Sequence, residues 1–157
     1  MKRIRLGNNR GVVIVDNEDY EELSKYKWSL HGCYEHNKYA YRKINGKSVM
    51  MHRVIMNPPS NMVIDHINGN GLDNRKANLR ICTATQNKAN NFSHLKGKLS
   101  KYKGVSLDHG LWIASIVNGN KKIRLGWFRD EKDAAMAYNE AASKYRGEFA
   151  RLNIIGE

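Results

Sequence analysis

Asp65, His66 and Asn87 carry side chains of the types that hydrolyse a phosphate ester with the help of a metal. Such hydrolysis needs a hard cation to offset the phosphate charge and a base to take a proton from water. The Asp65 carboxylate and the Asn87 amide oxygen are hard oxygen ligands of the kind that magnesium and manganese prefer. His66 titrates near neutrality and is the natural base. These residues therefore predict a site for one divalent metal, Mg²⁺ or Mn²⁺.

A hairpin followed by a helix is needed to bring these side chains together. Val63–Asp65 is expected to be a short strand, and a loop rich in glycine and asparagine leads back to a second strand, Leu79–Cys82. Thr83 or Thr85 then caps a helix that carries Asn87 on its first turns. If the hairpin packs on this helix, the carboxylate, the imidazole and the amide meet at one end of it.

The same segment has simpler interpretations. An Asp-His pair is usually a surface pair, and a cluster of asparagine and glycine is usually a turn. The loop also mimics a calcium-binding EF-hand, but that interpretation fails because the first and twelfth positions would be His66 and Ala77, where carboxylates are required. A purely structural hairpin stays as the alternative. The other histidines have no evident partners and are expected to be structural: His31, His36, His52, His94 and His109.

The segment follows the pattern DHxNGNxLDNRxxNLRxxTxxQNxxN and closely resembles HNH endonucleases of the phage homing type. The resemblance implies a ββα-metal nuclease domain in which His66 is the general base and Asp65 and Asn87 bind one divalent metal. It also implies that Asn78 braces the hairpin and orients the base without touching the metal. The third letter of the motif is asparagine here, as in the phage nicking branch, which argues against zinc. Arg80 is expected to contact a phosphate.

Short elements precede this segment. Two strands flank a turn-rich spacer, a helix and three more strands follow, and a second helix stops before two prolines. The expected bounds are Ile4–Leu6, Val12–Val15, Asp16–Lys25, Trp28–Leu30, Lys38–Ile44, Lys47–Met50 and His52–Met56. Asp16 is expected to cap the first helix, and Asn45-Gly46 is expected to form a tight turn.

The C-terminal part reads as three strands followed by one helix. Tyr102–Leu107, Trp112–Val117 and Ile123–Phe128 are β-rich runs separated by two turns. Asp130 is a good N-cap, alanines and tyrosines then recur on one face, and Gly147 stands where a helix ends. This pattern predicts a three-stranded antiparallel sheet packed on one helix.

This βββα unit resembles the DNA-binding domain of the plant ethylene-response-factor (Apetala-two) type over nearly all of residues 101–153. The resemblance rests on scaffold residues such as Gly104, Trp127 and Asn153. It implies that the sheet enters the major groove of DNA. The expected contacts are Lys103, Trp112, Lys121, Lys122 and Arg124. Trp112 and Trp127 could instead be core aromatics. The residues that read bases in the plant proteins do not match, so their specificity is not transferred.

Composition limits the class of protein. The chain has 157 residues with 27 Lys+Arg against 15 Asp+Glu, a net charge of +12, which suggests a polyanionic partner. It has no apolar run near the ~20 residues of a membrane helix, and no secretory signal is visible at its start. Cys33 and Cys82 form no CxxC pair, which fits a reducing cytosol. We expect no membrane association and a cytoplasmic location in a phage or bacterial host cell, associated with DNA.

The positive charge is spread over both halves, with 15 basic and 8 acidic residues in 1–92 and 12 and 7 in 93–157. We therefore expect an α+β protein of two modules: an endonuclease domain at 1–94, a basic linker at 95–100 and a DNA-binding domain at 101–157. The alternative is that the proposed linker is a surface loop within a single domain.

The expected function is a site-preferring, homing-type endonuclease that cuts double-stranded DNA to 5′-phosphate and 3′-hydroxyl ends. One site per chain implies that a monomer nicks one strand. Cutting both strands would need a dimer, which we expect to be weak, or two visits by the monomer. One alternative is a non-catalytic, sequence-specific DNA-binding regulator that keeps the nuclease fold. RNA binding is another, which the charge permits but the sheet does not favour.

Overall fold

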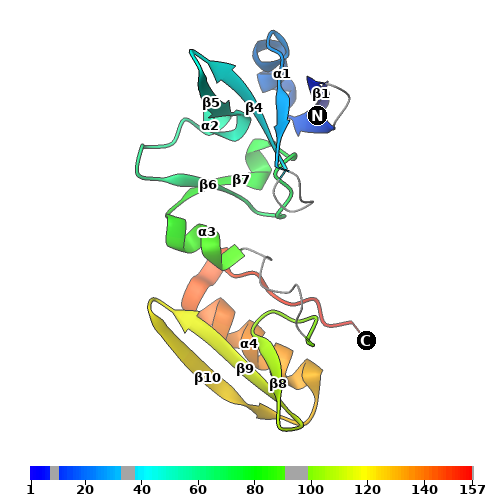
Figure 1. Cartoon of the computed structure of the whole chain (residues 1–157), viewed down its shortest axis with the longest axis vertical. Coiled ribbons are helices and arrows are strands. Elements are labelled where there is room, and N and C mark those ends of the chain that lie inside the picture. Colours follow the sequence, from blue (N-terminus) through cyan, green and yellow to red (C-terminus); the bar gives the residue numbers. More distant parts are fainter. Residues whose placement is uncertain (8–10, 33–37, 91–98, 157) are drawn as a thin grey trace. The chain divides into compact units, whose positions relative to one another are not determined.

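The computed structural model of the chain describes residues 1–7, 11–32, 38–90 and 99–156. Its contacts divide it into two units, Met1–Asn87 and Lys88–Glu157, each of which is described by itself (Figure 1). The division falls ahead of residue 94, where the sequence-based boundary was placed. Most of the predicted linker, residues 95–98, lies outside the described residues, as do Cys33, His36 and His94.

The first unit contains three separate antiparallel sheets and short helices. The predicted elements are present: three strands have the predicted bounds, and the bounds of the others differ by one or two residues. They are β1 (Lys2–Arg5), β2 (Val12–Val15), α1 (Asn17–Ser24), β3 (Ser29–His31), β4 (Tyr39–Ile44), β5 (Lys47–Met50), α2 (Met51–Met56), β6 (Val63–His66) and β7 (Leu79–Cys82). Strands pair as β1-β2, β3-β4-β5 and β6-β7. Helix α3 (Ala84–Asn90) follows β7 and crosses the division between the units.

Local chemistry explains where these elements end. Asn45 and Gly46 both have positive φ (49° and 77°), as expected for the tight turn between β4 and β5. Asn57 is left-handed (φ 40°) and ends α2 just before Pro58, which cannot continue a helix.

The core of the first unit forms between the N-terminal hairpin, α1 and the β3-β4-β5 sheet. It gathers the buried side chains Ile4, Leu6, Val13, Val15, Leu23, Trp28, Ala40 and Met51. Trp28 is 1% exposed, and its indole Nε1 donates a hydrogen bond to the Leu23 carbonyl at 2.8 Å. The indole therefore packs in the core while its polar atom is hydrogen-bonded to the end of α1.

The N-terminal hairpin also supports the loop between β6 and β7. Ile14 donates its N–H to the Leu72 carbonyl and accepts from the Asn74 N–H, both at 2.8 Å. Asp16 does not cap α1 with its side chain, contrary to the prediction. Its Oδ2 accepts a hydrogen bond from the backbone N–H of Lys76 at 2.8 Å, so the carboxylate holds the distant loop. Sequence spacing cannot reveal such a contact between residues sixty positions apart.

The second unit is the predicted sheet on one helix. Strands β8 (Val105–Asp108), β9 (Leu111–Asn118) and β10 (Lys121–Phe128) pair antiparallel in the order β10-β9-β8. Helix α4 (Glu131–Arg146) packs along one face of the sheet (Figure 1). It does so through small alanines and one tyrosine, namely Ala134, Ala135, Ala141, Ala142 and Tyr138. As predicted, Asp130 caps the helix by accepting from the Lys132 N–H at 2.6 Å.

Among the described residues, no helix combines the length and the apolar character that crossing a membrane requires.

Candidate active site and the exposed sheet face

The β6–β7 hairpin holds Asp65 and His66 at the end of β6. Asp65 lies opposite Arg80, and His66 lies opposite Leu79. Both are buried, with 4% and 5% of their surface exposed. Oδ2 of Asp65 accepts from Arg80 Nε at 2.8 Å and from Arg80 Nη2 at 2.6 Å. The guanidinium predicted to contact a phosphate is thus engaged with the predicted metal ligand, and it offsets the buried negative charge.

Asn78 braces the loop that follows His66. Its Nδ2 donates to Asn68 Oδ1 at 3.1 Å and to the Asp73 carbonyl at 2.8 Å, while its Oδ1 accepts from the Asn68 N–H at 3.0 Å. Asp73 in turn binds Arg75 through both oxygens, and this pair holds the pKa of the carboxyl below its usual range. The loop is therefore fixed by its own polar side chains, with Asn78 at its centre.

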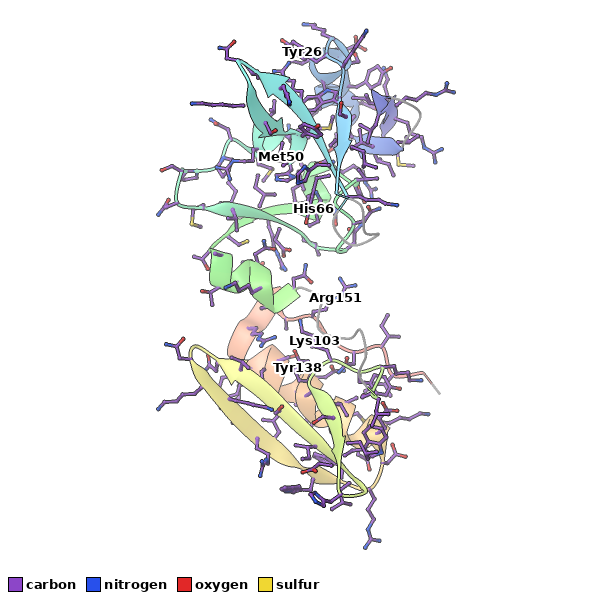
Figure 2. The ribbon with its side chains drawn as sticks, in the orientation of Figure 1. Tyr26, Met50, His66, Lys103, Tyr138 and Arg151 are labelled. Carbon is purple, nitrogen blue, oxygen red and sulfur yellow. The ribbon has the colours of Figure 1, made fainter. Side chains whose placement is uncertain are left out.

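Two aromatic side chains surround the imidazole of His66, which is labelled in Figure 2. The ring of His52, from α2, lies 5.2 Å from it at 83°. The ring of Tyr39, at the start of β4, lies 5.7 Å from it at 47°. From the sequence, His52 is expected to have only a structural role, and Tyr39 is not predicted as a site residue. Helix α2 has only six residues and is apolar around most of its circumference, so its pattern does not indicate which side faces β6.

Burial sets the charge state of both imidazoles. It lowers the pKa of His52 to about 4, with smaller contributions in the same direction from His66 and Arg53. Burial also lowers the pKa of His66, against the opposing effects of the Asn74 amide and the carboxylates of Asp65 and Asp73. Both rings are therefore neutral at neutral pH, and a neutral imidazole is the form that accepts a proton.

We expect the free energy of unfolding of the wild type to fall more steeply with decreasing pH than that of His52→Phe. His52 has its ordinary pKa of 6.5 in the unfolded chain and a pKa of about 4 when folded, so the unfolded state binds the proton first. The free energy of unfolding that depends on neutral His52 is complete above pH 6.5. It decreases towards pH 4, by up to about 1.4 kcal/mol per pH unit. Denaturant titrations at a series of pH values measure this difference, and parallel curves for the two proteins would contradict it.

Helix α3 carries Asn87 one turn beyond the hairpin. Thr83, rather than Thr85, is the cap: its Oγ1 accepts from the Gln86 N–H at 3.2 Å, and Gln86 Oε1 accepts from the Thr83 N–H at 2.8 Å. This reciprocal pair is a capping box. Asn87 is half-buried, and its N–H donates to the Thr83 carbonyl at 3.0 Å.

The two oxygen donors predicted as metal ligands lie on separate elements of the chain, Asp65 in β6 and Asn87 in α3. In the described part of the chain, no three His, Cys, Asp or Glu side chains cluster in a way that could hold a metal. Mg²⁺ binds through one or two carboxylates together with waters and substrate phosphates. A carboxylate, on Asp65, and an amide oxygen, on Asn87, are donors that such a cation accepts.

The face of the second sheet that is turned away from α4 carries basic and aromatic side chains. Cross-strand pairing puts Lys122 beside Val117, Arg124 beside Ser115 and Trp127 beside Ile113. These residues alternate with Ala114 and Ile116, which pack against the helix. Trp127 is 47% exposed, and the Arg124 guanidinium lies 4.5 Å from the centre of its ring. Lys121, also exposed, begins β10.

Two of the residues predicted to contact DNA lie elsewhere in this unit. Trp112 is paired with Phe128 and packs against the core on the helix side, so it matches the core alternative. Lys103 is 8% exposed, and its Nζ donates to the Ala89 carbonyl (Figure 2). Burial, with Arg146 and Arg151 nearby, lowers its pKa to about 8. Neither side chain contributes to the exposed face.

Comparison with known proteins identifies relatives of each part. The sequence model of the HNH endonuclease family matches residues 49–89. An uncharacterised HNH endonuclease of Acanthamoeba polyphaga mimivirus is 31% identical over 153 residues, which cover 96% of this chain and 79% of the viral protein.

The C-terminal region is similar to plant proteins. An AP2/ERF and B3 domain-containing protein of Oryza sativa is 45% identical over 58 residues, and the ethylene-responsive transcription factor WRI1 of Arabidopsis thaliana is 46% identical over 60. Each match covers 36% of this chain but only 16% and 14% of the plant proteins, so the likeness is confined to one domain of theirs. The viral relative spans nearly the whole chain, and the family match contains Asp65, His66, Asn78 and Asn87. The chain belongs to the HNH endonuclease family.

Proposed function

We propose that this protein is a homing-type endonuclease that nicks double-stranded DNA as a monomer, with the Asp65–His66 pair as the centre of its site. The observation that carries the proposal is the environment of His66, a buried and neutral imidazole next to a carboxylate that Arg80 already balances. A group in that state accepts a proton at neutral pH, as hydrolysis by water requires.

Each side chain of the site has a separate task in this proposal. His66 takes a proton from the water that attacks phosphorus. The 3′ oxygen leaves and takes a proton from solvent, so the products are a 5′-phosphate and a 3′-hydroxyl. Asp65 and Asn87 would hold Mg²⁺ or Mn²⁺, which when bound supplies Lewis acidity towards the phosphate. Asn78 keeps the loop after His66 in place through its three hydrogen bonds. Arg80 holds the Asp65 carboxylate.

A plasmid assay tests the proposal. The full chain is incubated with supercoiled plasmid that carries candidate target sites, in Mg²⁺ or Mn²⁺. We expect open circles to appear before any linear product, because one chain has one site, and we expect a chelator to stop the reaction. Ligation of the nick without end repair would establish the 5′-phosphate and 3′-hydroxyl. Binding of the plasmid without any cleavage would instead favour a non-catalytic DNA-binding regulator.

We further propose that the exposed face of the second sheet holds the duplex. Lys122, Arg124 and Trp127 occupy that face with the geometry given above, and one of the similar plant proteins, WRI1, is named as a transcription factor. A twisted three-stranded sheet has the width of the major groove, and guanidinium groups bind both phosphates and guanine edges.

Arg124→Ala should weaken DNA binding, and the slope of log affinity against log salt should fall by about one if Arg124 contacts a phosphate. The matched control is Lys144→Ala, which removes the same charge from an exposed position on α4, the helix that covers the opposite face. Fluorescence anisotropy with a labelled duplex at several salt concentrations measures both effects. Equal losses for the two variants would mean that only net charge matters and that the face is not a specific contact.

A further inference from the structure

Three rings, each from a different element (β4, α2 and β6), form a triangle of mutual contacts in the first unit. The ring centres of Tyr39, His52 and His66 are separated by 5.6 Å (Tyr39 to His52), 5.7 Å (Tyr39 to His66) and 5.2 Å (His52 to His66). The two contacts of His52 are edge-to-face, at 77° and 83°. Each ring therefore touches both others, and His66 is in contact with His52 and Tyr39 at once.

The loop that follows His66 holds Tyr39 in this triangle. A Cβ on Gly71 would come within 2.5 Å of the Tyr39 ring and 2.3 Å of the Lys38 carbonyl oxygen. Only glycine allows the loop backbone to approach the tyrosine this closely. Because Asn78 and Asp73 fix the same loop, the close approach of its backbone at Gly71 restrains the Tyr39 ring.

His52 contacts His66 and Tyr39 through the packing of its ring. Its Nδ1 is buried, and it has no hydrogen-bond partner in the part of the chain that the structure describes. The edge-to-face arrangement with His66 is the geometry that aromatic rings prefer. A phenyl ring at position 52 should therefore reproduce most of what the imidazole does, and a methyl group should not.

We infer that His52 and Tyr39 are positioning residues that fix the plane of the His66 imidazole, and this inference rests on the proposed role of His66 as the base. The torsion that turns an imidazole about its Cβ–Cγ bond is intrinsically broad, so the side chain does not fix its own ring plane. A base works only when its nitrogen points at the proton it removes. Two rings packed on His66 add to the hydrogen bond with the Asn74 side chain, and together they supply the restraint that the torsion lacks.

The test uses the full chain and compares His52→Ala with His52→Phe. Misplacing a reacting group by about 1 Å costs about a hundredfold in rate, so we expect His52→Ala to lower the single-turnover nicking rate by about 10- to 100-fold. The enzyme concentration that gives half-maximal rate should stay close to that of the wild type. His52→Phe should restore most of the rate. His31→Ala, which removes an exposed histidine in edge-to-face contact with Tyr41, is the matched control and should leave the rate unchanged.

A second readout does not depend on cutting. Carbon relaxation of the His66 ring, measured by NMR, reports how firmly the imidazole is held. We expect the ring to become more mobile in His52→Ala and to regain its order in His52→Phe, with no change in His31→Ala. If the wild type does not cut DNA but the His66 ring loosens in this way, the proposed function fails and the positioning role stands.

A His66 ring that is as ordered in His52→Ala as in the wild type overturns the inference, whatever the nicking rate. If His52→Ala does not fold, Tyr39→Leu and Tyr39→Phe replace the pair at position 52 in the same measurements. Tyr39→Leu removes the ring and Tyr39→Phe keeps it. Equal order of the His66 ring in these two variants would equally overturn the inference.

Discussion

Asp65→Ala is expected to reduce the rate of plasmid nicking by about a thousandfold and to destabilise the first unit by about 3 kcal/mol. The loss of rate follows because the proposed metal loses its only carboxylate, and Lewis-acid stabilisation of the transition state is worth several kcal/mol. The loss of stability follows because Arg80, only 14% exposed, loses the carboxylate that offsets its buried charge. Nicking assays and denaturant titrations measure the two effects.

The double variant Asp65→Ala/Arg80→Met separates these two causes. Removing the guanidinium as well eliminates the uncompensated buried charge, so we expect most of the lost stability to return. The rate should stay low, because methionine supplies no oxygen ligand. If the double variant regains both stability and nicking, the single variant failed through folding, and Asp65 is not a metal ligand.

Gly104→Ala should destabilise the second unit by about 3 kcal/mol or more. Gly104 has a φ of +77°, and a Cβ there would lie 1.9 Å from the Tyr138 ring and 2.8 Å from the Ser115 carbonyl oxygen. The left-handed backbone costs an alanine about 1–2 kcal/mol, and forcing atoms into a packed core adds about 1–3 kcal/mol. Hydrogen exchange of the β9 amides in the full chain measures the stability of this unit.

Gly110→Ala is the matched control for this substitution. Gly110 has nearly the same backbone conformation, with a φ of +79°, but nothing lies within 4 Å of its added Cβ. Gly110→Ala should therefore lose only the stability that the left-handed backbone costs an alanine, about 1–2 kcal/mol. If the two variants lose the same stability, the close packing of Gly104 under Tyr138 contributes nothing.

The parts of this protein that sequence reasoning predicted are those determined by neighbouring residues. Contacts within a few positions determine the cap of α3, expected at Thr83 or Thr85, the tight turn at Asn45-Gly46 and the cap of α4 at Asp130. Such contacts fix where strands and helices begin and end. The presence and the order of the strands and helices could therefore be predicted from these local contacts.

The tryptophans of the second unit show why some site residues could not be assigned to the correct face. In a regular strand Arg124 and Trp127, three positions apart, point to opposite faces. The register shifts between Arg124 and Gly126, and this irregularity turns Trp127 to the same face as Arg124. Trp112 remains on the helix side. A bulge of one residue has no clear sequence signal, so the sequence did not decide between a core and an exposed position for Trp127.

The surroundings of His66 were missed for a different reason. Tyr39 and His52 come from β4 and α2, and they meet His66 only because separate sheets pack together. Lys103 is similar, since its buried contact with the Ala89 carbonyl joins residues fourteen positions apart. Local patterns do not contain such tertiary contacts, and a lysine is rarely buried. The motif predicts the reacting groups, and tertiary packing determines what surrounds them.

The central claim, that His66 is the base of a DNA-nicking site, is tested most directly by the single-turnover nicking rate of His66→Ala in Mg²⁺. His109→Ala is the control, because its imidazole is 93% exposed on a turn of the second unit. Loss of a general base costs about 10²- to 10⁴-fold, so we expect His66→Ala to fall by that factor while His109→Ala nicks like the wild type. A folded His66→Ala that nicks at the wild-type rate would contradict the account.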